Sequence, residues 1–226
     1  MSDNQTDAVA GAQWAAERAF VAERLRACVQ ASGQSGRPHL SFNATKIRNA
    51  KASERAGHPV SKVLAYDSFT DTITVDLPMV FVAPGMCVLS DANLVAMVDG
   101  FLLHELGHWR DRFTEFVVHY GGICAALVWI PCWALSEVLD QMMVNVIGVV
   151  AACALAGVWK LASLPVGRRQ ERRADEYMAD VGGATVSAAM LAGVARGHVP
   201  GGDPWKVYDD PAVRRARVER RLAQRR

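Results

Sequence analysis

The pentapeptide His104-Glu105-Leu106-Gly107-His108 has the residue types and the spacing of a metal-dependent hydrolase. Two histidines four positions apart on a helix lie on one face, so both imidazoles can bind the same ion. The glutamate after the first histidine points toward the open coordination position. There it can take a proton from a zinc-bound water and later pass it to the leaving amine. The motif therefore predicts one Zn²⁺ per chain, with His104 and His108 as ligands and Glu105 as catalytic base.

A catalytic zinc needs a third protein ligand, and the segment RRQERRADEYMADVGGA offers two candidates. Glu171 is followed four residues later by Asp175, and Glu176 is followed at the same distance by Asp180. On a helix this spacing lets the glutamate bind the metal while the aspartate accepts a hydrogen bond from a ligand histidine. The residues alone leave both pairs open. The pair that does not serve the metal is expected to form salt bridges on an arginine-rich helix.

The elements that must position these residues are mostly helices. Ser90 is the expected N-cap of a helix over about 91–113, which carries the first motif, and a helix over about 168–195 carries the second. Gly107 is expected to let another backbone approach closely. The β-branched segment 71–83 predicts two short strands broken near Pro78, or one strand that ends there.

Two further helices are expected nearer the ends of the sequence. Apolar residues at three- and four-residue steps predict an amphipathic helix over about 7–31. Near the other end, Asp210 suits an N-cap and Pro211 a first helical position, so a very basic helix is expected to follow. Its arginines most simply form a solvated helix face, and no nucleic-acid partner is expected.

Composition excludes few classes of protein. The 226 residues carry a net charge of +2, which favours no particular partner, while 51% of them are hydrophobic. The five cysteines are odd in number and show no C-x-x-C spacing, so they are interpreted as reduced structural residues. The first twenty residues lack the basic start and long apolar run of a secretory signal. The N-terminal part is therefore expected to stay in the cytoplasm.

Two apolar runs, at about 116–135 and 142–164, are each near the length that a helix needs to cross a bilayer. They predict a transmembrane hairpin; a pair of buried core helices or a hairpin dipping into one leaflet are the alternatives. Arginines precede the first run and follow the second, whereas the link between the runs carries only Glu137 and Asp140. By the positive-inside rule this pattern predicts a multi-pass protein of the inner (cytoplasmic) membrane with its site facing the cytoplasm.

HELGHW, two apolar segments and then R-x-x-E-Y-x-A-D-x-G-G-A together resemble the HtpX/CAAX-prenyl-protease group of membrane zinc peptidases. The resemblance covers about 71–222. It implies a zinc endopeptidase that hydrolyses peptide bonds of membrane or misfolded proteins. It favours Glu176 as the third ligand and Asp180 as its hydrogen-bonding partner, because an aromatic residue follows that glutamate and small residues follow that aspartate. Glu171 with Asp175 is the alternative.

The resemblance also implies a mainly α (α+β) fold, with zincin-like helices, a small β-sheet and a two-helix membrane hairpin. Residues 1–59 are expected to form a helical, variable N-terminal region. Residues 60–226 are expected to form the peptidase domain, interrupted by the hairpin at 116–164. Thr72–Asp76 or Met79–Val82 is expected to supply a strand edge for an extended substrate. His198, Tyr208 and Arg173 are candidates for stabilising the transition state.

The partners expected from these features are a protein or peptide substrate and membrane lipid. Two other functions fit parts of the sequence. A membrane metallopeptidase of the antibiotic-sensor type shares HExxH beside membrane helices, but the segment 176–184 disfavours it. A catalytically silent membrane adaptor would keep the zinc site structurally, but it would have no use for Glu105.

Overall fold

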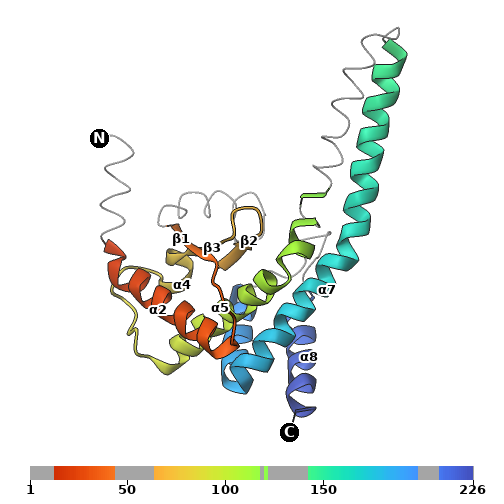
Figure 1. Cartoon of the computed structure of the whole chain (residues 1–226). Helices are drawn as coiled ribbons and strands as arrows, with labels where there is room; N and C mark the ends of the chain where they lie inside the picture. The colour runs from red at the N-terminus through yellow and green to blue at the C-terminus, as the bar shows by residue number, and fades with distance from the viewer. Residues whose placement is uncertain (1–12, 44–63, 118–119, 122–141, 198–208, 226) are drawn as a thin grey trace, which may run out of the picture.

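The computed structural model describes residues 13–43, 64–117, 120–121, 142–197 and 209–225. Its elements follow in the order α2 (Ala15–Ser32), β1 (His39–Asn43), β2 (Leu64–Asp67), β3 (Thr72–Asp76), α4 (Leu77–Phe81), α5 (Ala92–Arg110), α7 (Met142–Gly197) and α8 (Pro211–Ala223). The fold is thus mainly helical with one small three-stranded sheet, as the sequence predicts (Figure 1). Most of the first apolar run, the link 136–141, His198 and Tyr208 lie outside the described residues.

β3 is the central strand of the sheet, whose order is β1-β3-β2. β1 runs parallel to β3, with His39 opposite Thr72, and β2 runs antiparallel, with Leu64 opposite Val75. The expectation that Thr72–Asp76 offers a free edge is therefore wrong, because both edges of that strand are paired. Met79–Val82 is not a strand either: Pro78 stands in the first turn of α4, where its fixed φ and missing N–H are tolerated.

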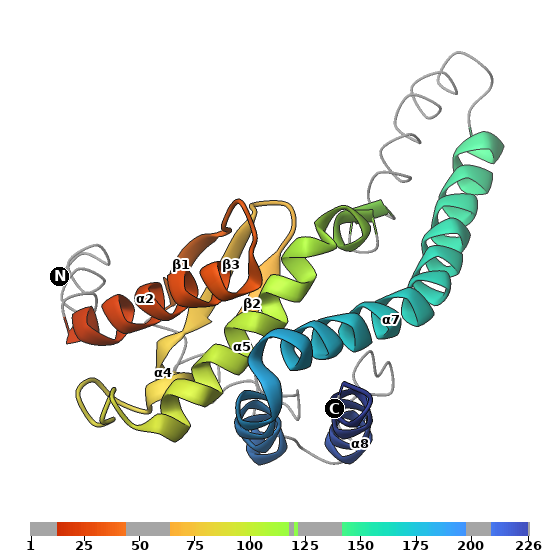
Figure 2. The ribbon, with the colours of Figure 1, turned by 60° about the horizontal axis from the view of Figure 1, so that its bottom comes forward.

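α5 lies between the sheet and α7 (Figures 1 and 2) and is buried on all sides over its second half. It begins one residue later than expected, because Asp91, not Ser90, accepts hydrogen bonds from the N–H groups of Asn93 and Leu94 at 2.8 and 3.0 Å. A helix that is buried on all sides is a core helix. The HELGH motif is therefore placed in the interior of the molecule, between the sheet and α7.

α2 packs against α5 through a charged contact. The Arg24 guanidinium donates to both carboxylate oxygens of Asp99, at 2.7 and 2.5 Å. The Cys28 thiol lies against the same carboxylate, and burial together with that charge raises its pKa to about 12. Cys28 is thus a buried, protonated thiol, in agreement with the structural role expected for it.

α7 is a long helix whose N-terminal half projects away from the body while its C-terminal half packs against α5 and α8 (Figures 1 and 2). Gly183 interrupts it with φ of 70°, a left-handed conformation that glycine adopts without strain. Beyond this break, α7 continues along α5 toward the N-terminus of α5, so that Gly100 lies directly against Met190.

The described residues contain one stretch, Gly157–Ala195 of α7, that is long and apolar enough to cross a membrane by length and composition. A core helix of a soluble protein passes the same test, so this finding does not support a multi-pass arrangement. The second expected run, 142–164, lies in the first half of α7. The transmembrane hairpin therefore stays a prediction.

α5 and α7 cross at Gly107. A Cβ atom added at Gly107 would lie 2.8 Å from the Cα atom and 3.2 Å from the Cβ atom of Ala174. Contacts that close do not occur between ordinary side chains and a backbone. The expectation that Gly107 permits a close backbone approach is confirmed, and the partner is α7.

We expect Gly107→Ala to destabilise the protein by about 1–3 kcal/mol, the usual cost of overpacking a core. The clash is with backbone, which cannot rotate away, and it outweighs the ~1 kcal/mol that alanine gains over glycine in a helix. Thermal unfolding followed by circular dichroism, in the presence of a chelator, measures this loss. Gly157→Ala on α7 is the matched control, since nothing lies within 4 Å of a Cβ there and its unfolding temperature should stay or rise. Equal unfolding temperatures for the two variants would contradict the close crossing.

Candidate metal centre

His104 and His108 project from one face of α5, one turn apart. Their rings are nearly perpendicular, at 80°, with centroids 5.0 Å apart, and the two Nε2 atoms are separated by 3.3 Å. Both residues are buried, at 5% and 6% exposure. The two imidazoles thus present the same nitrogen to one small, enclosed volume.

Glu171 of α7 completes this cluster. Its Oε2 lies 3.2 Å from His104 Nε2, and its Oε1 lies 3.4 Å from His108 Nε2. One ligand atom from each of the three residues falls within 4.8 Å of the others. Two imidazole nitrogens and one carboxylate oxygen that converge in this way form a donor set that zinc accepts, with a fourth position left for water or substrate. The residues present therefore fit a metal ion.

Each histidine also has a carboxylate at its other nitrogen. His104 Nδ1 lies 3.1 Å from Asp175 Oδ1, and His108 Nδ1 lies 3.5 Å from Glu115 Oε1. Neither contact has the alignment of a full hydrogen bond, so both are close charge contacts. A carboxylate at Nδ1 favours the tautomer that carries its proton there, which leaves Nε2 free to bind a metal.

The charges of the cluster shift the pKa values of its members strongly. Burial disfavours the charged form of His104, but the carboxylates of Asp175 and Glu171 outweigh burial and raise its pKa. Burial likewise opposes protonation of His108, and Glu115 and Glu171 raise its pKa well above the ordinary value. Burial disfavours the ionised form of Glu171, yet the two imidazoles hold its pKa well below the ordinary value. Glu171 is therefore ionised. Its negative charge favours positive charge at this point, either a proton on each histidine or a bound metal ion.

Glu105 lies on the sheet side of the cluster. Its Oε2 accepts a hydrogen bond of 2.7 Å from the backbone N–H of Tyr66 in β2, and its side chain is largely buried at 8% exposure. β2 is an edge strand of the sheet. Glu105, the expected base, thus lies next to His104 in the sequence, and its carboxylate is bonded to the edge strand β2.

The structure favours the alternative candidate for the third ligand. It brings Glu171, not Glu176, to the histidines, and Asp175, not Asp180, to His104. Five residues on a helix correspond to a rotation of about 140° from the first side chain. Glu176 is therefore turned away from the cluster when Glu171 faces it.

Asp180 has a structural role instead. Its two carboxylate oxygens accept hydrogen bonds from Arg221 of α8 at 3.0 and 2.9 Å, and Arg225 lies 2.8 Å from it. This carboxylate ties α8 to α7. Within the pair formed by Glu176 and Asp180, Asp180 thus forms salt bridges with arginines of α8, as expected for an acid on an arginine-rich helix.

Two residues near the metal centre were not predicted from the sequence. Glu115 follows His108 by two helical turns, and that spacing could have indicated it. Arg214 of α8 donates to both oxygens of Asp175, at 2.9 and 2.6 Å. It is one of many arginines in its helix, and no sequence pattern distinguishes it.

Arg173, a candidate for stabilising the transition state, is about half exposed and pairs with Asp111 at 3.4 Å.

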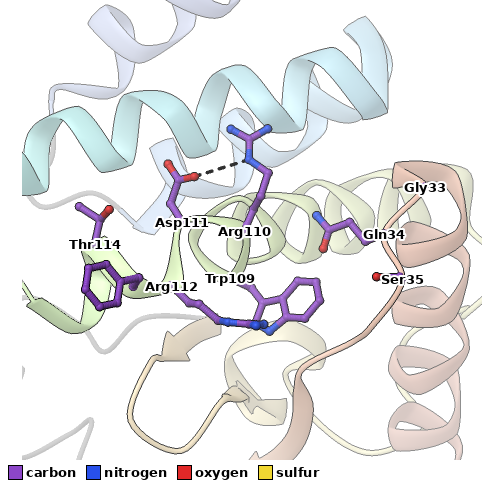
Figure 3. Close-up of a pocket in the computed structure, with 9 residues that line it drawn as sticks. Gly33, Gln34, Ser35, Trp109, Arg110, Asp111, Arg112 and Thr114 are labelled. Atoms are coloured by element: carbon purple, nitrogen blue, oxygen red, sulfur yellow. Dashed lines mark ion pairs between the residues drawn. The ribbon is translucent and has the colours of Figure 1, made fainter.

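A wide cleft of about 600 Å³ lies beside the C-terminal end of α5 (Figure 3). The cleft is lined by Trp109, which is the residue after His108, by Arg110 and Arg112, and by the turn at Gln34. Arg112 lies over the Trp109 ring at 5.3 Å, and Arg110 pairs with Asp111 at 3.6 Å. None of the three candidate metal ligands lines the cleft, so it adjoins the candidate centre without enclosing it.

Comparison of the chain with protein-family models, with curated proteins and with solved structures returned no match.

We expect the purified protein to bind one zinc ion per chain and Glu171→Gln to weaken binding by more than the ~10–100-fold that a change beside a ligand costs. The amide keeps the shape of the side chain but loses the charge that faces both Nε2 atoms. Competition against a chromophoric chelator measures the affinity. Glu176→Gln is the matched control, five residues along the same helix, and should bind zinc as the wild type does. Loss of zinc from Glu176→Gln alone would restore the ligand that the sequence pattern favours.

Proposed function

We propose that this protein is a zinc-dependent endopeptidase. The observation that carries the proposal is the convergence of His104 Nε2, His108 Nε2 and a Glu171 carboxylate oxygen, with a carboxylate that is no part of this set, Glu105, next to them in the motif. A purely structural metal site has no need of an additional carboxylate. The resemblance to HtpX-type peptidases supports the same function.

His104, His108 and Glu171 would hold the metal. Zinc bound there supplies a Lewis acid that polarises the substrate carbonyl and brings the pKa of a water molecule down toward neutrality. Glu105 acts as the general base that accepts a proton and then delivers it to the departing amine. Asp175 and Glu115 orient the two imidazoles through their Nδ1 atoms. Burial of all these groups keeps bulk water from screening their charges.

The strand edge that serves the substrate is β2, Leu64–Asp67. The Tyr66 N–H that donates to Glu105 is turned toward α5, away from β3. Leu64 and Tyr66, which are two positions apart, present their peptide groups on this same side. An extended peptide that adds to β2 would therefore run beside the HELGH motif, and one of its carbonyl groups would replace Glu105 as the acceptor of the Tyr66 N–H. Only unfolded or extended segments fit this mode of binding.

The location proposed is the inner membrane, with the centre on the cytoplasmic side. Val150, Val158 and Leu161 on the projecting half of α7 are 63%, 63% and 59% exposed. Where this half joins the body, an aromatic cluster gathers: the ring of Tyr120 lies 5.5 Å from that of Phe69 and 5.4 Å from that of Phe116.

We place the membrane–water interface at this cluster. Aromatic residues concentrate at membrane–water boundaries, and arginines concentrate on the cytoplasmic side of them. Arg168 and Arg169 follow on α7 toward the metal centre and are exposed. The Tyr120 hydroxyl donates to Asp67 Oδ1 at 2.9 Å, so the cluster is joined to the last residue of β2. The substrate edge would then begin close to the membrane surface.

The test of the enzyme is cleavage of an unfolded model protein by the full chain in mild detergent. We expect zinc-loaded wild type to cleave, chelator to abolish cleavage, and Glu105→Gln to lower the rate by about 10²–10⁴ while zinc binding persists. Gel electrophoresis and mass spectrometry of the fragments follow the reaction. Zinc binding without cleavage by the wild type would favour a silent adaptor, and cleavage that survives Glu105→Gln would exclude Glu105 as the base.

The membrane proposal has a separate test. We expect the full chain to remain in the pellet when membranes are extracted with alkaline carbonate, because two apolar runs would be buried among lipid chains. Immunoblotting of pellet and supernatant measures this. Glu105→Gln should partition identically, which excludes an effect of self-cleavage. Release of both into the supernatant would mean that the runs pack within a soluble core.

A further inference from the structure

Arg214 brings a charge from α8, a helix outside the zinc motifs, into the metal centre. It is 5% exposed, and Asp175, to which it donates, is 1% exposed. Its Nε lies 2.9 Å from Asp175 Oδ2, and its Nη2 lies 2.6 Å from Asp175 Oδ1. The same Oδ1 atom lies 3.1 Å from His104 Nδ1. One carboxylate oxygen is thus shared between a guanidinium and a candidate metal ligand.

The geometry of this contact determines what the carboxylate can do. A two-pronged guanidinium fixes both the position and the plane of a carboxylate, which a single ammonium group does not. A buried carboxylate without a cation is strongly disfavoured and tends to take up a proton or turn toward water. If Asp175 turned away or became protonated, it would no longer favour the His104 tautomer that leaves Nε2 free for a metal.

We propose that Arg214 is a positioning residue of the metal centre: it holds Asp175, which holds the His104 ring, so that docking of α8 strengthens metal binding. The proposal rests on the metal-binding part of the proposed function and not on peptide hydrolysis. It also gives α8 a role beyond the burial of apolar surface by Val218, which is 2% exposed.

α8 contains its own control. Arg221, seven residues further on, makes the same kind of two-pronged contact with Asp180 of α7, at 3.0 and 2.9 Å. Asp180 contacts no metal-binding residue in the described part of the chain. The two pairs join the same helices with the same chemistry, and they differ in whether the carboxylate also touches a histidine of the cluster.

The experiment compares zinc affinity among Arg214→Met, Arg221→Met and the wild type, by competition with a chromophoric chelator on the full chain. We expect Arg214→Met to weaken zinc binding by about 10–100-fold, the usual effect of losing a partner of a ligand. Arg221→Met should stay within about twofold. Thermal unfolding in chelator measures the stability of each variant without metal. Equal zinc affinities for the two variants would overturn the proposal.

A double-mutant cycle separates positioning from general damage to the fold. Asp175→Asn removes the buried charge, so the double variant Asp175→Asn/Arg214→Met has no unpaired carboxylate. We therefore expect the double variant to fold even if Arg214→Met alone does not. We expect the double variant to bind zinc as weakly as Asp175→Asn, because Arg214 acts through Asp175. A further tenfold loss in the double variant would contradict that route. Failure of the wild type to bind zinc would overturn the metal centre itself, whereas unaffected binding in Arg214→Met would overturn only the role of Arg214.

Discussion

The close crossing of α5 and α7 at Gly107 and Ala174 is the contact on which the candidate metal centre depends. Because no side chain separates the two backbones there, a carboxylate on α7 reaches the imidazoles of α5 directly. Glu171 stands one turn before Ala174, and His108 directly follows Gly107. A larger residue at either position would push the helices apart and move Glu171 away from the imidazoles. The glycine in the motif is thus as much a part of the site as the histidines.

Electrostatics imposes a second constraint on the same few residues. Glu105, Glu115, Glu171 and Asp175 are all buried around two imidazoles, and Asp175 has Arg214 beside it. Without a metal, protons on the histidines balance these negative charges, which is why the pKa values of both rings are raised. A divalent cation carries the same charge as two such protons, and it must displace them to bind. Metal uptake and proton release are therefore parts of one equilibrium.

Much of the fold and part of the site could be predicted from the sequence. The first motif, its helix, the closing helix capped by Asp210 and the strand that ends before Pro78 follow from local patterns that short-range physics enforces. The third ligand could not be chosen in this way, because Glu171 and Glu176 have the same local spacing. What decides between them is the rotation of α7 about its axis. That rotation is set by the apolar face of Ala174 and Met178, which lies on the side of Glu171 and Asp175. β1 and β2 were missed because short edge strands take their conformation from a neighbour, in this case β3.

The groups of the centre come from distant parts of the chain, with Glu171 67 residues after His104 and Arg214 39 residues after Asp175. Since a chain is made from its N-terminus, the histidine pair and Glu105 exist long before the carboxylate that completes the set. During that interval the half-made protein cannot hold the ion tightly. If the chain is the zinc peptidase proposed above, this order of synthesis keeps it inert while its own unfolded segments, and those of neighbouring nascent chains, are most exposed to cleavage.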